Sequence, residues 1–186
     1  MTREFRIEAY AIVSADHMIA DATNVMPPAL KHEADQRFFR AALDAAAAIA
    51  LGRVTHEAER NSARRRRLVL TRRVAGIAPD PGDAHALFWN PAGTTFEAAR
   101  IGLGLRQGML AVIGGAEVYA TFLDIGYDAF HLTRANKARL PGGHPVLPDI
   151  STSRSPEDVL RERGLRAGPL RLIDPGAGLT LVTWTR

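Results

Sequence analysis

Apolar and polar residues alternate along this chain in short runs that predict β-strands, and longer segments with helical periodicity separate them. The first run, residues 5–14, alternates and then becomes apolar, which is typical of a strand whose two faces become buried. Later runs predict strands at residues 47–52, 67–72, 85–90, 109–114 and 129–135.

Helices are predicted between these strands. The first has strong helix formers and an apolar stripe, whereas Gly102 and Gly104 weaken the third. The segment 15–32 is expected to be a loop, because Pro27 and Pro28 oppose a helix there. The predicted helices span residues 33–47, 54–60 and 95–107, and a fourth begins at Ala116.

This order of elements predicts an α/β fold with a mainly parallel central sheet. Strands and helices alternate through about residue 135, which favours parallel strands with helices on the faces of the sheet. The segment 140–158 is rich in turn residues, and residues 165–174 and 178–186 then predict a C-terminal antiparallel hairpin. No repeat or linker divides the chain, so a single domain over residues 1–186 is expected.

Composition narrows the class of protein. The chain has 186 residues, of which 46% are apolar and 24% charged, as in ordinary globular proteins. No apolar run reaches the roughly 20 residues needed to cross a bilayer, so no membrane partner is expected. There are no cysteines, which fits the cytoplasm and excludes disulfides and cysteine nucleophiles. The six histidines lack metal-ligand spacing, so no metal site is predicted.

The net charge of +4 comes mainly from arginine, and the densest run is residues 63–73. Such a run is able to bind nucleic acid. Here it leads directly into a strand and carries no interleaved aromatic residues, so a nucleic acid is a less favoured partner than a phosphorylated small molecule. A solvated surface is the alternative.

Three strand-to-helix junctions have the character of anion sites. One strand ends at Gly114 and Gly115 just before a helix, where unpaired backbone N–H groups favour a phosphate. The alternative is a tight turn that needs glycine only for its backbone angles. Two other strands end beside Arg53 and Arg72. Such junctions meet at the carboxyl edge of a parallel sheet, so together they favour a phosphate-rich ligand.

The first helix carries a carboxylate next to two aromatic residues. Asp35, Phe38 and Phe39 share one helical face, where they could hold the polar edge of a flat heterocycle. The alternative is that Asp35 favours the helix N-terminus and both phenylalanines are core residues. Burial should raise the pKa of Asp35 and the helix N-terminus should lower it, and the sequence does not decide between them.

The order of several motifs resembles the dihydrofolate reductase superfamily, which also includes the reductase domain of riboflavin biosynthesis. The matching stretches, from about residue 5 to residue 150, are AIVSADHMIAD, LGRVTHE, RRLVLTRR, VIGGAEVYATFL, FHLTRA and PVLPDI. The resemblance implies a three-layer α/β/α fold and a reductase that uses NADPH. Two positions depart from the pattern: Pro28 replaces a tryptophan and Ala116 replaces a third glycine.

The resemblance also implies roles for individual residues. Asp35 would hold the edge of a pterin, supported by Thr133, with Tyr119 near the reacting ring. Arg65 would contact the anionic tail of the substrate, while the helical face shared with Asp35 already makes Phe38 and Phe39 candidates for contact with its ring. The implied cofactor-binding residues are Ala11, Arg53, Thr55, Thr71, Arg72, Gly114, Gly115, Ala116 and Glu117.

The sequence leaves several alternatives open for the substrate, the class of protein and the cofactor. The substrate is a pterin such as dihydrofolate, or a phosphorylated ribosylaminopyrimidinone of the riboflavin pathway. A non-catalytic module that binds nucleotide or nucleic acid through residues 64–67 is a different class, and a reductase that prefers NADH is a third. Tyr127, Phe130 and Leu132 fit either the core or a homodimer contact.

Overall fold

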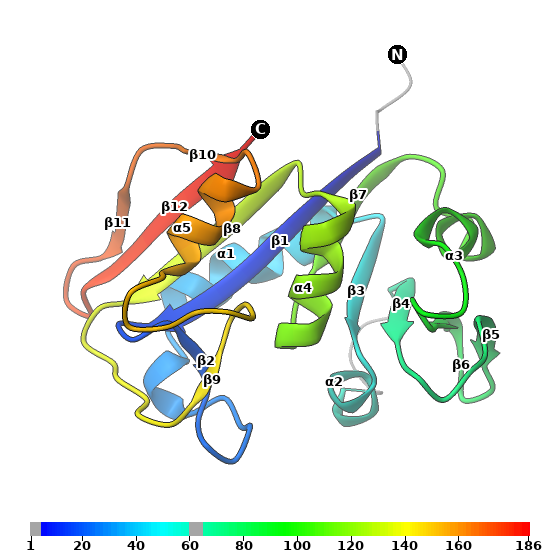
Figure 1. Cartoon of the computed structure of the whole chain (residues 1–186), viewed down its shortest axis with the longest axis horizontal. Coiled ribbons are helices and arrows are strands. Elements are labelled where there is room, and N and C mark those ends of the chain that lie inside the picture. Colours follow the sequence, from blue (N-terminus) through cyan, green and yellow to red (C-terminus); the bar gives the residue numbers. More distant parts are fainter. Residues whose placement is uncertain (1–4, 60–64) are drawn as a thin grey trace.

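The computed structural model describes residues 5–59 and 65–186. In this part of the chain ten strands form one sheet in the order β10-β12-β8-β1-β7-β3-β4-β6-β5, with β11 also pairing with β12 (Figure 1). The parallel strands are β1 (Phe5–Ser14), β3 (Ala48–Gly52), β4 (Arg67–Leu70), β6 (Asp83–Trp89), β7 (Gly108–Val112) and β8 (Ala129–Ala135). The antiparallel strands are β5 (Ile77–Asp80), β10 (Arg166–Ala167), β11 (Arg171–Asp174) and β12 (Leu179–Thr185).

Helices cover both faces of this sheet, which gives three layers. Figure 1 shows α1 behind the sheet and α4 and α5 in front of it. The front core also takes in side chains of α3, and the cluster behind the sheet joins Tyr10, Ile49 and Met109 to Phe38 and Phe39. The helices are α1 (Glu33–Ala45), α2 (Arg53–Ala58), α3 (Phe96–Gly102), α4 (Ala116–Ile125) and α5 (Pro156–Glu162). The mainly parallel α/β/α fold with a C-terminal antiparallel pair is thus confirmed.

The strand register brings the candidate junctions to one edge of the sheet. Val112 pairs with Ala9 of β1 and with Ala50 of β3. Ala11, Gly52 and Gly114 each follow two residues after this aligned set, Ala11 near the end of β1, Gly52 at the end of β3 and Gly114 just beyond β7. Gly52 pairs with Leu70, so the segment after β4 begins at the same edge. We call it the carboxyl edge, the place where α/β sheets bind ligands.

Some boundaries differ from the sequence-based predictions. The first helix ends at Ala45 rather than residue 47. The third ends at Gly102 rather than residue 107, because Gly104 adopts a left-handed φ of 70° that ends the turn. The loop after β1 contains two short elements that were not predicted, the strand β2 (Met18–Ala20), paired with β9 (His144–Pro145), and a 3-10 turn at Pro28–Leu30.

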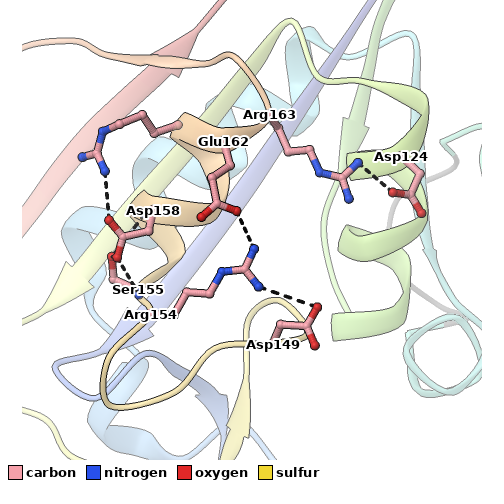
Figure 2. A network of polar contacts seen from close by, with 8 residues as sticks. Asp124, Asp149, Arg154, Ser155, Asp158, Glu162 and Arg163 are labelled. Atoms are coloured by element: carbon pink, nitrogen blue, oxygen red, sulfur yellow. Dashed lines mark hydrogen bonds and ion pairs between the residues drawn. The ribbon is translucent and has the colours of Figure 1, made fainter.

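Helix α5 was missed, although its N-terminal signal is present in the sequence. Ser155 caps the helix, Pro156 occupies the first turn, and Asp158 completes a capping box with Ser155. Ion pairs then join the helix to its surroundings (Figure 2): Arg154 lies between Glu162 and Asp149. Arg163 also lies 2.8 Å from Asp124 of α4, as Figure 2 shows.

The antiparallel strand β5 was also missed, because Pro79 weakens a strand signal except at a sheet edge.

A buried polar cluster ties α2 to the sheet. His56 Nε2 lies 2.7 Å from Asp80 Oδ2, and Arg67 Nη1 lies 3.2 Å from His56 Nδ1. All three residues are buried. Arginine only donates hydrogen bonds, so Nδ1 accepts and the ring proton sits on Nε2, which donates to Asp80. The cluster fixes where the residues of α2 reach the carboxyl edge.

No helix within residues 5–59 and 65–186 combines the length and the apolar character required to cross a membrane.

Candidate active site

A small cavity lies between α1 and the sheet, and the side chain of Asp35 lines it. Its volume is about 20 Å³, which corresponds to roughly one water position. A ring-shaped ligand needs more room, so side chains must move for one to enter. Phe38 and Phe39, on the α1 wall, are only half-buried. The residues that line the cavity are Tyr10, Ala11, Ile12, Asp35, Phe38, Phe39, His131 and Thr133.

Burial raises the pKa of the Asp35 carboxyl above its usual value. A hydrogen bond from Thr133 and the nearby His32 oppose this rise without cancelling it. Asp35 also lies in the first turn of α1, whose N-terminus favours a negative charge. The sequence left the balance open, and in the structure burial dominates. The Asp35 carboxyl, which Thr133 holds in place, can therefore keep a proton and form hydrogen bonds to a ring-shaped ligand.

Tyr119 lies on α4, on the opposite face of the sheet from Asp35, and reaches the cavity only through the backbone of Tyr10. Its hydroxyl donates a 2.5 Å hydrogen bond to the backbone carbonyl of Tyr10, and its own carbonyl accepts from Tyr127. The side chain is buried, and burial together with the nearby Asp35 raises its pKa. Tyr119 does not line the cavity. In this arrangement it holds the backbone of β1 beside the cavity.

Two cavity residues, Tyr10 and His131, were missed by the sequence interpretation. Their rings stack with centroids 4.5 Å apart, and Phe38 packs against both. Glu8 Oε2 accepts from the Tyr10 hydroxyl at 3.0 Å and lies 3.1 Å from His131 Nε2. His131 Nδ1 is 3.0 Å from the Thr183 hydroxyl. The alternation of β1 in the sequence indicates that Tyr10 faces the side of the sheet covered by α1. In the structure Tyr10 pairs with His131 of β8, which brings the two rings together on that face.

We expect Glu8→Gln to destabilise the protein at neutral pH but not in acid. The hydrogen bond from His131 lowers the pKa of Glu8 despite its burial, and the hydrogen bond from Tyr10 and the positive charges of His131 and Arg6 act in the same direction. The stabilisation by ionised Glu8 is therefore present above its unfolded pKa and is lost as pH falls through its lower folded pKa. The loss on substitution should be about 1–3 kcal/mol in the free energy of unfolding near pH 7.

Urea unfolding of both proteins at neutral pH and near pH 3 checks this. The difference in unfolding free energy should shrink toward acid. Glu33→Gln is a suitable control, because Glu33 is exposed and pairs with Arg37 on the surface of α1. A loss for Glu8→Gln that is equal at both pH values contradicts the expectation.

The Gly114–Gly115 bend is open toward the carboxyl edge. A Cβ placed on Gly114 would meet no atom within 4 Å, and one on Gly115 only a methyl of Val118 at 3.5 Å. Gly115 has a φ of 83°, which L side chains rarely adopt, so the bend requires glycine there. It supplies no capping side chain to α4, whose first turn begins at Ala116 and Glu117. The bend therefore leaves room for a phosphate beside the N–H groups of α4.

The predicted phosphate-contacting side chains lie around the same edge. Arg53 and the half-buried Thr55 are in α2, directly after β3. Thr71 and Arg72 follow β4. Thr71 is buried and its hydroxyl accepts from the backbone N–H of Arg73, whereas Arg72 is exposed. Ala11 lines the Asp35 cavity and stands two residues beyond Ala9, the residue that pairs with Val112, so the cavity lies toward the same edge as the Gly114–Gly115 bend.

The arginine run does not form one continuous cationic surface in the described part of the chain. Arg64 lies outside the described residues. Arg65 donates to the Leu43 carbonyl and pairs with Asp44, at the C-terminal end of α1. Arg67 is buried in the cluster with His56, and Arg66 is exposed. Residues 65–67 therefore point to three different places, which disfavours binding of nucleic acid through this run.

The three residues that fitted either the core or a homodimer contact are buried within the chain itself. Tyr127, Phe130 and Leu132 are each at most 3% exposed and pack in the front core. Their apolar character is thus explained by the fold.

Comparisons with known proteins identify the fold. No protein-family model and no curated protein matches the chain. Among solved structures it is similar to a pyrimidine reductase-like protein from Corynebacterium diphtheriae, at 17% identity and a TM-score of 0.67, over 97% of this chain and 91% of that one. It is also similar to dihydrofolate reductase from Enterococcus faecalis complexed with NADP(H), at 16% identity and a TM-score of 0.65, over 100% of this chain and 99% of that one.

A third similar structure is the diaminohydroxyphosphoribosylaminopyrimidine deaminase/5-amino-6-(5-phosphoribosylamino)uracil reductase from Thermotoga maritima. The identity is 16% and the TM-score 0.63, and the match covers 98% of this chain but only 56% of that one. The layered sheet, the strand order and these similarities together establish that the chain has the dihydrofolate reductase-like fold.

Proposed function

We propose that this protein is an NADPH-dependent reductase that transfers hydride to a C=N or C=O carbon of a small heterocycle, either a pterin or a pyrimidine. The observation that carries the proposal is that Ala11 and Gly114 each stand two residues beyond the aligned pair Ala9 and Val112 of neighbouring parallel strands. It joins an open anion-binding bend to a cavity that contains a buried carboxylate of raised pKa. A perturbed carboxylate next to an anion site is an arrangement that favours a function over a structural role.

The residues at the carboxyl edge suit a dinucleotide with phosphates. The N–H groups at the start of α4 would hold the pyrophosphate, with Arg53 and Thr55 beside it. Arg72 would contact a 2′-phosphate and Thr71 the adenosine. When bound, the reduced nicotinamide supplies the hydride. Ala11 would line the wall against which the two reacting rings are aligned.

Asp35 would orient and protonate the substrate. Its carboxylate accepts N–H bonds from the polar edge of the ring, and Thr133 holds the carboxylate in place. A proton held between an Asp35 oxygen and the ring nitrogen makes the accepting carbon more electrophilic. Tyr119 would act by fixing the carbonyl of Tyr10, and Phe39 by packing on the ring. These residues position the substrate and exclude water.

The substrate class can be narrowed with a direct comparison. Similar structures include both a dihydrofolate reductase and a reductase of a phosphoribosylaminouracil, which supports either choice. Arg65 would face the anionic tail of either substrate, although it already contacts the end of α1. Turnover of dihydrofolate and of a phosphorylated ribosylaminopyrimidinone with NADPH should separate the two.

A titration with NADPH, followed by nicotinamide fluorescence, tests the cofactor proposal. We expect saturable binding of NADPH and a loss of about 1.5–3 kcal/mol in NADPH binding for Arg72→Ala, because a charge-assisted contact to the 2′-phosphate disappears. NADH binding should be nearly unaffected. Arg66→Ala is the control, since Arg66 is exposed but contacts Gly104, away from the carboxyl edge. No binding of either nucleotide, together with salt-sensitive retention on DNA or RNA, would instead favour the non-catalytic module.

A further inference from the structure

The exposed arginine at the proposed 2′-phosphate position already has an anionic partner. Arg72 Nη2 lies 3.1 Å from Glu117 Oε1, and the two side chains are 83% and 85% exposed. Glu117 belongs to the first turn of α4 and therefore follows directly after the open glycine bend. The pair bridges the segment after β4 and the start of α4, the two places between which the adenosine half of a dinucleotide would lie.

The other arginines of the carboxyl edge are paired in the same way. Glu57 of α2 lies 2.6 Å from Arg53 and 3.7 Å from Arg73. Two carboxylates thus stand next to the three arginines Arg53, Arg72 and Arg73. A phosphate that binds to one of these three arginines must compete with a carboxylate of the protein itself.

Glu117 affects the two nicotinamide cofactors differently. A 2′-phosphate carries negative charge, so it must displace Glu117 from Arg72 and then remains close to that carboxylate. Like charges at such short separation repel each other, even near the surface. NADH has a ribose hydroxyl at this position instead. A carboxylate can accept a hydrogen bond from it, as acidic residues do in other dinucleotide sites.

We infer that Glu117 is a cofactor-specificity residue that opposes the selection of the 2′-phosphate by Arg72, so that the site binds NADH as well as NADPH. This inference rests on the proposed function. Arg72 and Glu117 act as a balanced pair: the first favours the phosphate and the second favours the hydroxyl. The NADPH preference of the protein is therefore modest, and it is set by the relative strength of these two exposed side chains.

The test measures dissociation constants of NADPH and NADH for the purified wild-type protein and for Glu117→Gln. The substitution removes the charge and keeps the shape. The ratio of NADPH affinity to NADH affinity should rise by about three- to tenfold, as expected for an exposed charge next to a phosphate. The rise should shrink at high salt, because screening weakens interactions between exposed charges.

Glu97→Gln is the matched control. Glu97 is also a first-turn glutamate paired with an arginine, Arg100 at 2.6 Å, but it belongs to α3. Its substitution removes the same charge and the same kind of helix stabilisation without touching the carboxyl edge. Its affinity ratio should equal that of the wild type.

The outcomes separate the inference from the function on which it rests. A higher ratio for Glu117→Gln alone supports the inference. If the wild type binds NADPH, three results overturn the inference and leave the reductase proposal intact. The ratio of NADPH affinity to NADH affinity is unchanged in Glu117→Gln, or the ratio changes equally in Glu97→Gln, or the wild type shows no detectable NADH binding. Failure of the wild type to bind either nucleotide overturns both.

Discussion

Replacement of Asp35 by Asn is expected to lower kcat/KM for the heterocyclic substrate by about 10²–10⁴-fold near neutral pH. The amide keeps the size of the side chain and its contact with Thr133. It cannot hold a proton at the ring nitrogen, and one of its two polar atoms donates where the substrate also donates. Steady-state turnover with NADPH measures the loss. Cofactor affinity should stay close to that of the wild type, because Asp35 lies on α1 and the residues proposed to contact the cofactor phosphates do not.

The pH dependence of Asp35→Asn provides two independent checks. Burial raises the pKa of Asp35, so the wild-type rate should fall as pH rises through that pKa, and the variant should lose this step. A raised carboxyl pKa also means that ionisation costs stability: the wild type loses stability as pH rises from the unfolded pKa through the folded one. Asp35→Asn should therefore melt higher than the wild type at neutral pH and equally near pH 3. A variant that keeps wild-type turnover contradicts the assigned role.

The parallel core of the fold was predictable because its signal is local. Continuous apolar runs mark the central strands, and the glycine and proline positions mark where each one ends. The structure confirms the strands around β1, β3, β4, β7 and β8 with boundary shifts of a few residues. Helix α5 was missed although its capping signal is local, whereas two of the missed strands depend on long-range pairing. β2 and β9 are 3 and 2 residues long and exist only because distant segments of the chain meet.

The candidate site likewise contains residues that were predictable from the sequence and residues that were not. Glycines, arginines and an acidic residue at strand ends could be grouped from the sequence, since parallel strands bring their carboxyl ends to one edge. The contribution of Tyr10 and His131 could not be, because it depends on which strand pairs with β1 and on the face to which each side chain turns. Likewise, residues 65–67 are adjacent and identical in the sequence, yet their side chains have three different environments.

Paired arginines at the carboxyl edge also change how the positive net charge is interpreted. Arg53, Arg72 and Arg73 contact Glu57 or Glu117, so the local charge is smaller than the sequence suggests. Affinity for a phosphorylated cofactor then depends on the difference between two sets of ion pairs. That difference is sensitive to single substitutions of these exposed side chains.

The second large effect is expected from Arg67→Met, which should destabilise the protein by about 3–5 kcal/mol. Arg67 is 2% exposed, and its guanidinium donates to His56 and to the Glu59 carbonyl. Methionine can fill the volume, but Asp80 then remains buried without the positive charge that balances it. For a domain of this length the melting temperature should fall by roughly 6–20 °C. Arg66→Met is the matched control and should change stability by less than about 0.5 kcal/mol.

A double-mutant cycle distinguishes loss of charge balance from loss of packing. In the wild type, Asp80→Asn removes the carboxylate that His56 and the backbone of Gly82 contact, so it should destabilise the protein. In the Arg67→Met background the same substitution removes a buried carboxylate from a network that has already lost the charge of Arg67, so its cost should be smaller or reversed. Coupling of about 0.5–3 kcal/mol between the two sites, measured by urea unfolding, is expected from residues in one network. Additive effects would mean that Arg67 stabilises the sheet through its volume alone, and α2 would then depend on packing rather than charge for its position at the carboxyl edge.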